Sequence, residues 1–264
     1  MKRPGPGPEI RGQTSADLDE LLASFDVGRI LFQGSGLLAL DKPAGLAVHA
    51  SESGAFGVAE ILAELSRLYP GLIEARAGKI HPAHLLDKEA SGVLLFGLTT
   101  AMRRRVQGAL AERHIDKRYV AVVAGPVEEA GEVRGRVRSK LRGRVRDLRS
   151  SASFTRIYGD DRLSLVEVIP REGRTHQIRA LFAKAGRPLA GDLRYGKPKP
   201  SRQFLERFDV PTLLLHVLAL RIPSGILGAR RTIRAPLPQA FLRVIEAKGW
   251  PLEEITAKLE SADQ

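Results

Sequence analysis

Residues 81–98 of the chain read HPAHLLDKEASGVLLFGL. The second part of this stretch, Val93–Leu98, is a continuous apolar run, which predicts a strand buried on both faces. The first part contains two histidines, two carboxylates and a serine. Because Asp87 comes just before a core strand, its surroundings can control its pKa, as is typical of functional carboxylates. The stretch therefore predicts a chemical site at the start of a central strand.

Two other interpretations of the polar part remain open. One is a turn with a purely structural role. The other is a metal site made of His81, His84 and Asp87, whose three-residue spacing would bring the side chains together on a helix. Pro82 argues against a helix at this point, and no other His or carboxylate motif completes a ligand set.

Outward from this stretch, the predicted elements follow one another in an irregular order. Apolar residues at helical spacing predict helices over Val58–Leu68, from Thr99 or Thr100 to Leu110, over Thr175–Ala185 and over Gln239–Lys248. Strands are predicted from Ile30 onward, at Gly36–Leu40, Leu46–His49, Arg118–Ala124, Leu163–Ile169 and Leu213–Ile222. Strands outnumber helices and regular βαβ units are absent, which favours an α+β fold with a mixed, mostly antiparallel sheet and flanking helices.

Length and composition set the domain organisation. The 264 residues suit one large domain, which we expect over 29–250, between a flexible N-terminal lead-in at 1–28 and a C-terminal tail at 251–264. The chain has no Cys, so disulfides, thiolate metal sites and a Cys nucleophile are excluded. No signal peptide or transmembrane run is evident, which predicts a soluble cytoplasmic protein with no membrane partner.

The net charge of +12 predicts a polyanionic partner. Seven basic residues, here called the basic strip, occupy every second position of 134–146: Arg134, Arg136, Arg138, Lys140, Arg142, Arg144 and Arg146. This period of two predicts that all seven lie on one face of an extended strand or hairpin. A strip that follows an RNA backbone and a solvated loop are both compatible with the pattern.

A second polar cluster, REGRTHQIR, spans residues 171–179. Gly173 allows a tight turn, and the helix start that follows attracts anions. Arg179, one turn into this helix, is either a bidentate partner of a distant carboxylate or a solvated side chain. Elsewhere, Tyr119 suits core packing or stacking on a base, and His216, within an apolar run, suits a core histidine.

Together, six blocks in order resemble the RluA-type family of RNA pseudouridine synthases over about residues 30–248. They are Leu40–His49, His84–Gly92, Lys117–Tyr119, Gly173–Arg179, Gly191–Gly196 and Leu215–His216. The resemblance implies a pseudouridine synthase fold, a sheet with helices outside and a central active-site cleft. It implies isomerisation of uridine in ribosomal or transfer RNA, without a metal or organic cofactor. We expect a monomer.

The resemblance also implies roles for single residues. Asp87 matches the catalytic carboxylate, Arg179 the arginine paired with it, and Tyr119 the tyrosine against the target base. We expect RNA contacts from the basic strip and from His84, Leu85, Arg174 and His176.

Two positions depart from the family pattern. The arginine expected two residues before the catalytic aspartate is Leu85, and the expected threonine is Ala90. Leu85 can wedge into a base stack through apolar contact, but it cannot contact phosphate or form a hydrogen bond. A protein that binds RNA without catalysis is therefore the main rival to an enzyme, ahead of a hydrolase that uses Asp87 as nucleophile.

Overall fold

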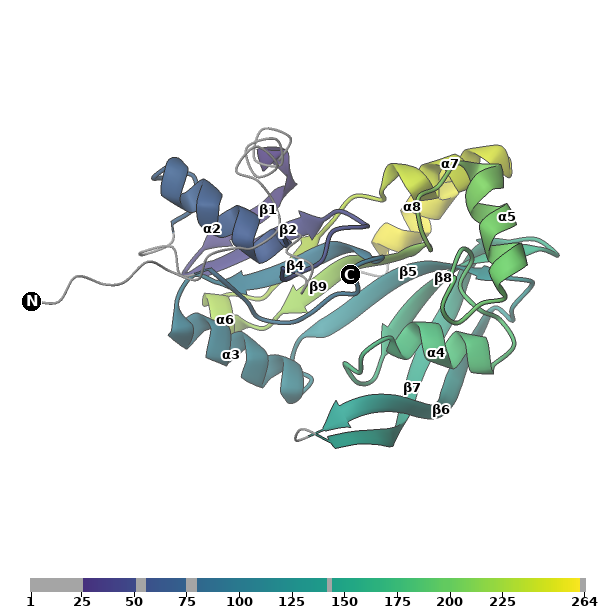
Figure 1. Ribbon diagram of the computed structural model, residues 1–264, viewed down its shortest axis with the longest axis horizontal. Helices are drawn as coiled ribbons and strands as arrows, with labels where there is room; N and C mark the ends of the chain where they lie inside the picture. Colours follow the sequence, from purple (N-terminus) through teal and green to yellow (C-terminus); the bar gives the residue numbers. More distant parts are fainter. Residues whose placement is uncertain (1–25, 51–55, 75–79, 142–143, 262–264) are drawn as a thin grey trace, which may run out of the picture.

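The computed structural model describes residues 26–50, 56–74, 80–141 and 144–261 (Figure 1). Its centre is one ten-stranded sheet in which β1-β2-β4-β9-β5-β8-β7-β6 are neighbours, while β3 pairs with β4 and β10 with β9. All strand pairs are antiparallel except β4 and β9, which run parallel. The bounds are β1 Ile30–Gly34, β2 Leu37–Lys42, β3 His81–Pro82, β4 Ser91–Gly97, β5 Asp116–Ala124, β6 Ala130–Leu141, β7 Arg144–Gly159, β8 Leu163–Pro170, β9 Leu215–Ile222 and β10 Arg231–Arg234. The predicted mixed, mostly antiparallel α+β fold is confirmed.

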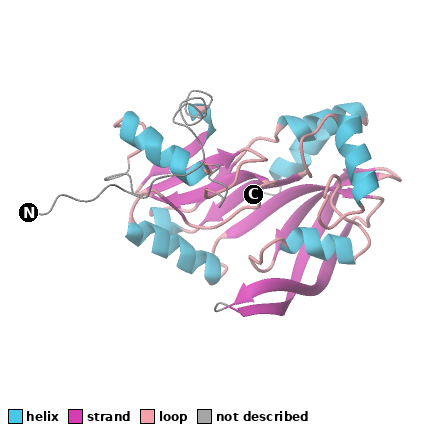
Figure 2. Ribbon diagram, in the orientation of Figure 1, coloured by secondary structure: helices cyan, strands magenta, loops and turns pink. Residues whose placement is uncertain are grey.

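Helices flank this sheet (Figure 2). They are η1 Val27–Arg29, α2 Val58–Leu68, α3 Thr100–Ala111, α4 Gln177–Lys184, α5 Pro198–Phe208, α6 Ser224–Leu227, α7 Gln239–Ala247 and α8 Leu252–Ser261. Helix α2 has the predicted bounds, and Thr99 caps α3 by accepting a hydrogen bond from the Met102 N–H at 3.0 Å. No helix in the described ranges is long and apolar enough to cross a membrane.

Two segments differ from the sequence prediction. Leu46–His49 is not a strand. Residues 252–261, expected within a C-terminal tail, form α8, because Ile255 and Leu259 bury their side chains in the core beside α7. The N-terminal lead-in lies almost entirely outside the described residues, as do residues 262–264.

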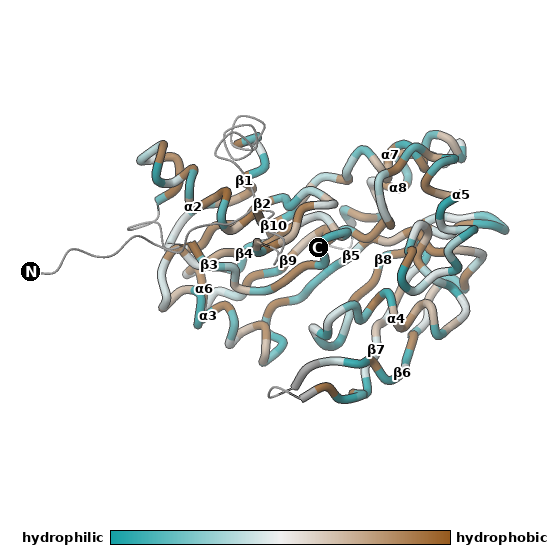
Figure 3. The backbone as a smooth tube through the Cα atoms, viewed as in Figure 1, coloured by the Kyte–Doolittle hydropathy of each residue, from teal (hydrophilic) through white to brown (hydrophobic). Residues whose placement is uncertain are grey.

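Three apolar clusters fill the space between sheet and helices. One packs α2 and α3 against β2 and β4, the second packs α7 and α8, and the third packs α4. Apolar residues concentrate along the central strands (Figure 3). The predicted strand Val93–Leu98 is almost wholly buried, with all but Leu98 in β4, and each large apolar side chain stabilises the fold by roughly 1.5–3 kcal/mol. This strand is a firm anchor for the polar loop that precedes it.

The basic strip does not lie on one face, so that prediction is wrong. Strands β6 and β7 form a hairpin in which Arg138 lies opposite Asp147 and Ser139 opposite Arg146. Cross-strand partners share a face, so Arg146 lies on the face opposite to Arg134, Arg136 and Arg138. The hairpin turn changes the parity of the alternation. Arg142 and the side chains of Lys140 and Arg144 lie outside the described part of the chain.

Candidate active site

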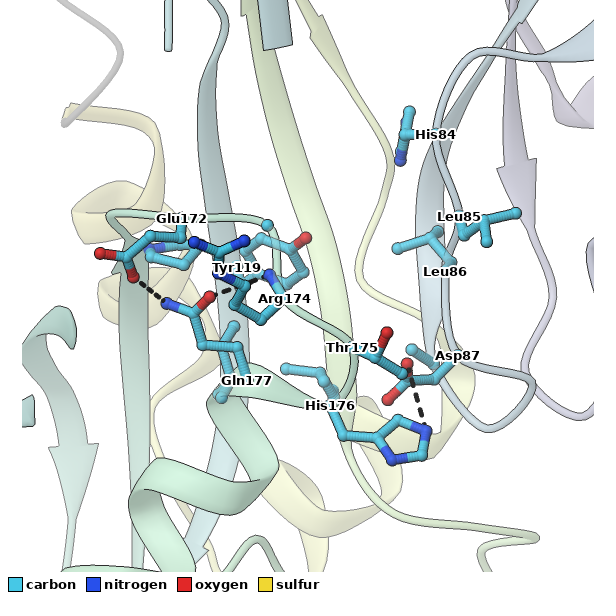
Figure 4. A pocket seen from close by; sticks show the side chains of 15 residues that line it. His84, Leu85, Leu86, Asp87, Tyr119, Glu172, Arg174, Thr175, His176 and Gln177 are labelled. Atoms are coloured by element: carbon cyan, nitrogen blue, oxygen red, sulfur yellow. Dashed lines mark hydrogen bonds and ion pairs between the residues drawn. The ribbon is translucent and has the colours of Figure 1, made fainter. Parts of the chain in front are cut away.

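A cavity of about 470 Å³ brings together three segments that are far apart in the sequence (Figure 4). One wall is the loop between β3 and β4, with Asp87. A second is Tyr119 of β5. The third is the turn before α4, from Glu172 to His176. The sequence prediction of a site at the start of a central strand therefore agrees with a cavity at that position.

Hydrogen bonds to β4 fix the loop that carries Asp87. The Ala83 N–H donates to the Leu95 carbonyl at 2.7 Å, and the Leu95 N–H donates to His84 Nε2 at 3.2 Å. At the other end Gly92 has φ 104°, and a Cβ there would lie 2.2 Å from the Val217 carbonyl oxygen. Only glycine allows β4 to approach β9 this closely. The Asp87 side chain, 16% exposed, is thereby held at the cavity wall.

A buried lysine, Lys42, forms hydrogen bonds to the same loop. The Lys42 ammonium donates to the carbonyls of Pro43 and Leu46, each at 2.8 Å, and of Lys88 at 3.3 Å. Burial lowers the pKa of Lys42 to about 8, although the charges of Asp87 and Glu89 act in the opposite direction. Lys42 therefore joins the turn after β2 to the loop beside Asp87.

Arg179 connects Asp87 to a second buried carboxylate. Its Nε and Nη2 donate to the two oxygens of Asp192 at 2.8 and 3.0 Å. Its Nη1 donates to Asp87 Oδ2 and to Glu89 Oε2, each at 3.1 Å. The residue is 2% exposed, which excludes the interpretation of a solvated side chain. The predicted pairing of Arg179 with Asp87 is present.

The charge states of Arg179 and Asp192 follow from their contacts. Burial alone would lower the pKa of Arg179, but the hydrogen bonds and charges of Asp192 and Asp87 raise it above its ordinary value. Burial alone would raise the pKa of Asp192, but Arg179 and the Tyr195 N–H lower it. Both Arg179 and Asp192 therefore carry their charges at neutral pH.

His176 lies on the other side of Asp87. Its φ of 53° is left-handed, and this turn brings the imidazole Nε2 to 3.7 Å from Asp87 Oδ1. Nδ1 lies 3.2 Å from the Tyr195 hydroxyl. Burial lowers the pKa of His176, opposed by the charge of Asp87, so the imidazole is neutral at neutral pH.

Tyr119, in β5, lines the cavity. Burial raises the pKa of its phenol, and the negative charge of Asp87 raises it further. The phenol therefore stays protonated at neutral pH, and its ring supplies an apolar surface beside the carboxylate. His216 is fully buried, with Nδ1 2.9 Å from Ser91 Oγ, which is the core histidine expected from the sequence.

The remaining predicted RNA-binding residues divide into two groups. His84, Leu85, Arg174 and His176 line the cavity, whereas no described residue of the basic strip does. Leu85 is 69% exposed. Sequence reasoning assigned no role to Lys42, Glu89 or Asp192. The Gly191–Gly196 block contained the signal for Asp192, a carboxylate next to a glycine, but nothing marked its partner.

The cavity walls offer no metal site. Among the residues that the structure describes, no group of three or more His, Asp or Glu side chains is placed to hold a metal ion. The alternative of a metal site made of His81, His84 and Asp87 is therefore not formed.

Comparisons with known proteins identify the family of the chain. The family model described as RNA pseudouridylate synthase matches residues 36–184. The chain is 33% identical over 242 residues to the ribosomal large subunit pseudouridine synthase C of Escherichia coli, covering 88% of this chain and 73% of that protein. It is 28% identical to the tRNA pseudouridine synthase C of Vibrio vulnificus, covering 86% and 98%.

Solved structures share the fold. Human RNA pseudouridylate synthase domain containing 4 superposes with a TM-score of 0.70 and 22% sequence identity, covering 88% of this chain and 97% of that one. The matched region includes Asp87, Tyr119 and Arg179. The chain belongs to the RluA-type family of RNA pseudouridine synthases, enzymes that isomerise uridine in RNA.

Proposed function

We propose that this enzyme isomerises specific uridines of ribosomal or transfer RNA to pseudouridine, with Asp87 as the catalytic carboxylate and without a cofactor. The observation that carries the proposal is the position of Asp87, in a cavity between the Arg179 guanidinium and the Tyr119 ring. Relatives named for transfer RNA and for ribosomal RNA match the chain over similar lengths, which supports both substrate classes.

The reaction suits a site with one ionised carboxylate. It breaks the N-glycosidic bond of uridine, turns the uracil and joins its C5 to C1′ of the sugar, so nothing is added or lost overall. Arg179 favours the ionised form of Asp87 through its charge and its hydrogen bond at 3.1 Å. Asp87 then acts either as a nucleophile on the sugar or base or as a base that takes a proton from the sugar.

Tyr119 and His176 have different roles in the proposed reaction. The protonated phenol of Tyr119 is unsuited to taking a proton at neutral pH, and its ring holds the detached uracil by stacking. His176, neutral and at the cavity wall, contacts the RNA.

The target uridine must leave its helix to reach Asp87. Extrusion costs about a few kcal/mol, and less from a loop than from a duplex. Leu85 at the cavity rim replaces the vacated base by apolar contact, which its exposure supports. His84, Arg174 and the basic strip contact the RNA, the basic strip through phosphates. The enzyme acts as a monomer in the cytoplasm, where these RNAs are found.

Tritium release tests the proposal. Purified ribosomal and transfer RNA from cells lacking the enzyme, labelled with tritium at C5 of uridine, is incubated with the protein, and tritium in water is counted. We expect release from at least one RNA class and none with Asp87→Asn, which keeps the size of the side chain but loses its charge.

The matched control is Glu89→Gln, which removes the other loop carboxylate that accepts from Arg179 Nη1. It should retain measurable release. Absence of release from RNA that the protein binds would support the rival, an RNA-binding protein without catalysis. Equal loss in Asp87→Asn and Glu89→Gln would contradict the assignment of Asp87.

A further inference from the structure

A second cavity of about 660 Å³ adjoins the catalytic cavity. It lies between the end of α3, the start of β5 and the end of β8. The two cavities share one wall, made of His84, Pro170, Glu172, Gly173 and Arg174. Figure 4 places Arg174 and Glu172 on this wall, on the side of the catalytic cavity away from Asp87. A ligand that fills both cavities must therefore pass along Arg174.

The second cavity is lined by positively charged side chains, of which Arg171 is paired with Glu132 at 4.0 Å. Arg113, Lys117, Arg171 and Arg174 line it. The Glu172 carboxylate is already used, because it accepts from the Gln177 amide at 2.8 Å and from the Ser151 N–H at 3.1 Å. Burial lowers the pKa of Lys117, opposed by the Glu172 charge. Within the described ranges, no hydrogen bond or ion pair holds the Lys117 ammonium.

Arg174 has an unused donor on the shared wall. Its Nε is buried and has no hydrogen-bond partner among the described residues. A buried donor without a partner costs about 1–3 kcal/mol, which is unusual in a native structure unless a water, an ion or a ligand supplies the acceptor. A phosphate oxygen is a suitable acceptor for a guanidinium.

The rest of the lining suits contact with a nucleobase. Leu110, Ile115 and Ile169 give the cavity an apolar surface, and its volume lies within the range of small-molecule sites. A positively charged groove for the backbone is one part of the usual mode of binding single-stranded nucleic acid, and here aliphatic side chains take the place of the aromatic platform for the base. Asp116 is the acidic group beside Glu172 in the lining, so the positive charges are in excess.

We infer that this second cavity binds the nucleotide next to the target uridine in the same RNA strand, with Arg174 against the phosphate that joins the two. The inference rests on the proposed function, because it takes the catalytic cavity as the site of the target uridine. It makes the second cavity a determinant of which uridine is modified.

Abasic RNA tests the inference by changing the ligand and leaving the lining of the second cavity intact. An RNA fragment carrying the modified uridine, once mapped, is made in three forms: intact, abasic at the 5′ neighbour and abasic at the 3′ neighbour. Affinity is measured by fluorescence anisotropy with Asp87→Asn, so that turnover does not interfere. We expect one abasic form to bind about tenfold more weakly, because the apolar contact of that base with the cavity is lost.

Two variants made in the Asp87→Asn background locate that effect. Gln107→Trp, on the exposed side of α3 that lines the cavity, places a bulky ring in the space. It should weaken the binding of intact RNA and remove the difference in affinity between intact and abasic RNA. Arg105→Trp introduces the same ring two residues earlier, on roughly the opposite side of α3, and should preserve the tenfold difference.

The outcomes separate the inference from the proposed function. Equal affinity for all three RNAs, or an equal effect of Gln107→Trp on all three, overturns the inference while tritium release stands. If no RNA releases tritium, the proposed function fails. The cavity is then tested with the trinucleotide UUU against its singly abasic forms, and equal binding of these overturns the inference as well.

Discussion

Arg179 and the basic strip are both cationic features of the sequence, but the structure treats them differently. Arg179 is almost fully buried and makes four hydrogen bonds to three carboxylates. The described arginines of the basic strip are exposed on both faces of a hairpin. Arg136 donates to the Asp147 carbonyl at 2.9 Å, and Arg134 pairs with the neighbouring Glu132.

The difference shows what each kind of charge is suited to do. A buried guanidinium with fixed partners sets the position and ionisation of Asp87, and its loss leaves other charges without compensation. An exposed guanidinium in water keeps its freedom and acts on distant anions through a field that salt screens. We therefore expect the two regions to respond to different variables, the first to partner loss and pH and the second to salt.

The largest effect is expected at Arg179. Arg179→Met leaves the fully buried Asp192 carboxylate without its cation, which should lower the free energy of unfolding by about 3–5 kcal/mol and abolish tritium release. Urea denaturation measures the stability loss.

The double variant Arg179→Met/Asp192→Asn separates stability from catalysis. It removes both charges of the pair, while the amide oxygen still accepts from the N–H groups of Arg194 and Tyr195, so it should restore most of the stability. Tritium release should stay absent, because Asp87 has lost its cation. A single variant that loses less than about 1 kcal/mol would show that the pair is not strongly coupled to the fold.

The same contrast explains what the sequence predicted. Local patterns are strong for α2, whose apolar spacing gave both ends, and for Thr99, whose hydroxyl caps α3. The Arg179–Asp87 pair spans 92 residues, and it was predicted only through the family resemblance. Periodicity alone assigned the basic strip to one face. In the sequence the basic residues keep alternating through the hairpin turn, but beyond the turn they lie on the opposite face of the hairpin.

Other contacts of the site had no local signal that would identify both partners. Asp192 and Glu89 share Arg179 with Asp87, and Lys42 reaches the Lys88 carbonyl across 46 residues. Such contacts depend on how distant strands meet in the sheet, which spacing within one segment does not encode. Helix α8 was missed for the same reason. Its two buried residues are covered by β7 and α7, which are distant in the sequence.

A smaller effect is expected from pH in the buried region. Burial lowers the pKa of His216 from 6.5 to about 4. Below pH 6.5 the unfolded chain therefore takes up a proton that the folded protein does not, and stability falls as the pH falls toward 4. Between pH 7 and pH 5 this loss is about 2 kcal/mol.

His216→Gln removes this group and should reduce the stability difference between pH 7 and pH 5 by about 2 kcal/mol, measured by urea denaturation at both values. The matched control is His114→Gln, whose side chain is 64% exposed, and it should leave the difference unchanged. An unchanged pH dependence in His216→Gln would mean that the folded protein accepts the proton as readily as the unfolded chain.

The smallest effect is expected at the basic strip. Arg136→Gln/Arg138→Gln removes two exposed charges from one face of the hairpin, and the midpoint of urea denaturation should not change. The Kd for RNA should rise roughly three- to tenfold at about 0.1 M salt, and the slope of log Kd against log salt should fall by about 1–2, because two phosphate contacts are lost.

Arg146→Gln makes the comparison within the hairpin, since it removes one charge from the opposite face. It should change the salt slope by at most about 1. A larger effect from Arg146 than from the pair would place the RNA on the face that packs toward α4, and no effect from either variant would assign the basic strip to solvent. Because salt weakens both sets of contacts but leaves Arg179 paired in the core, the same titration separates recognition of the RNA backbone from the control of Asp87.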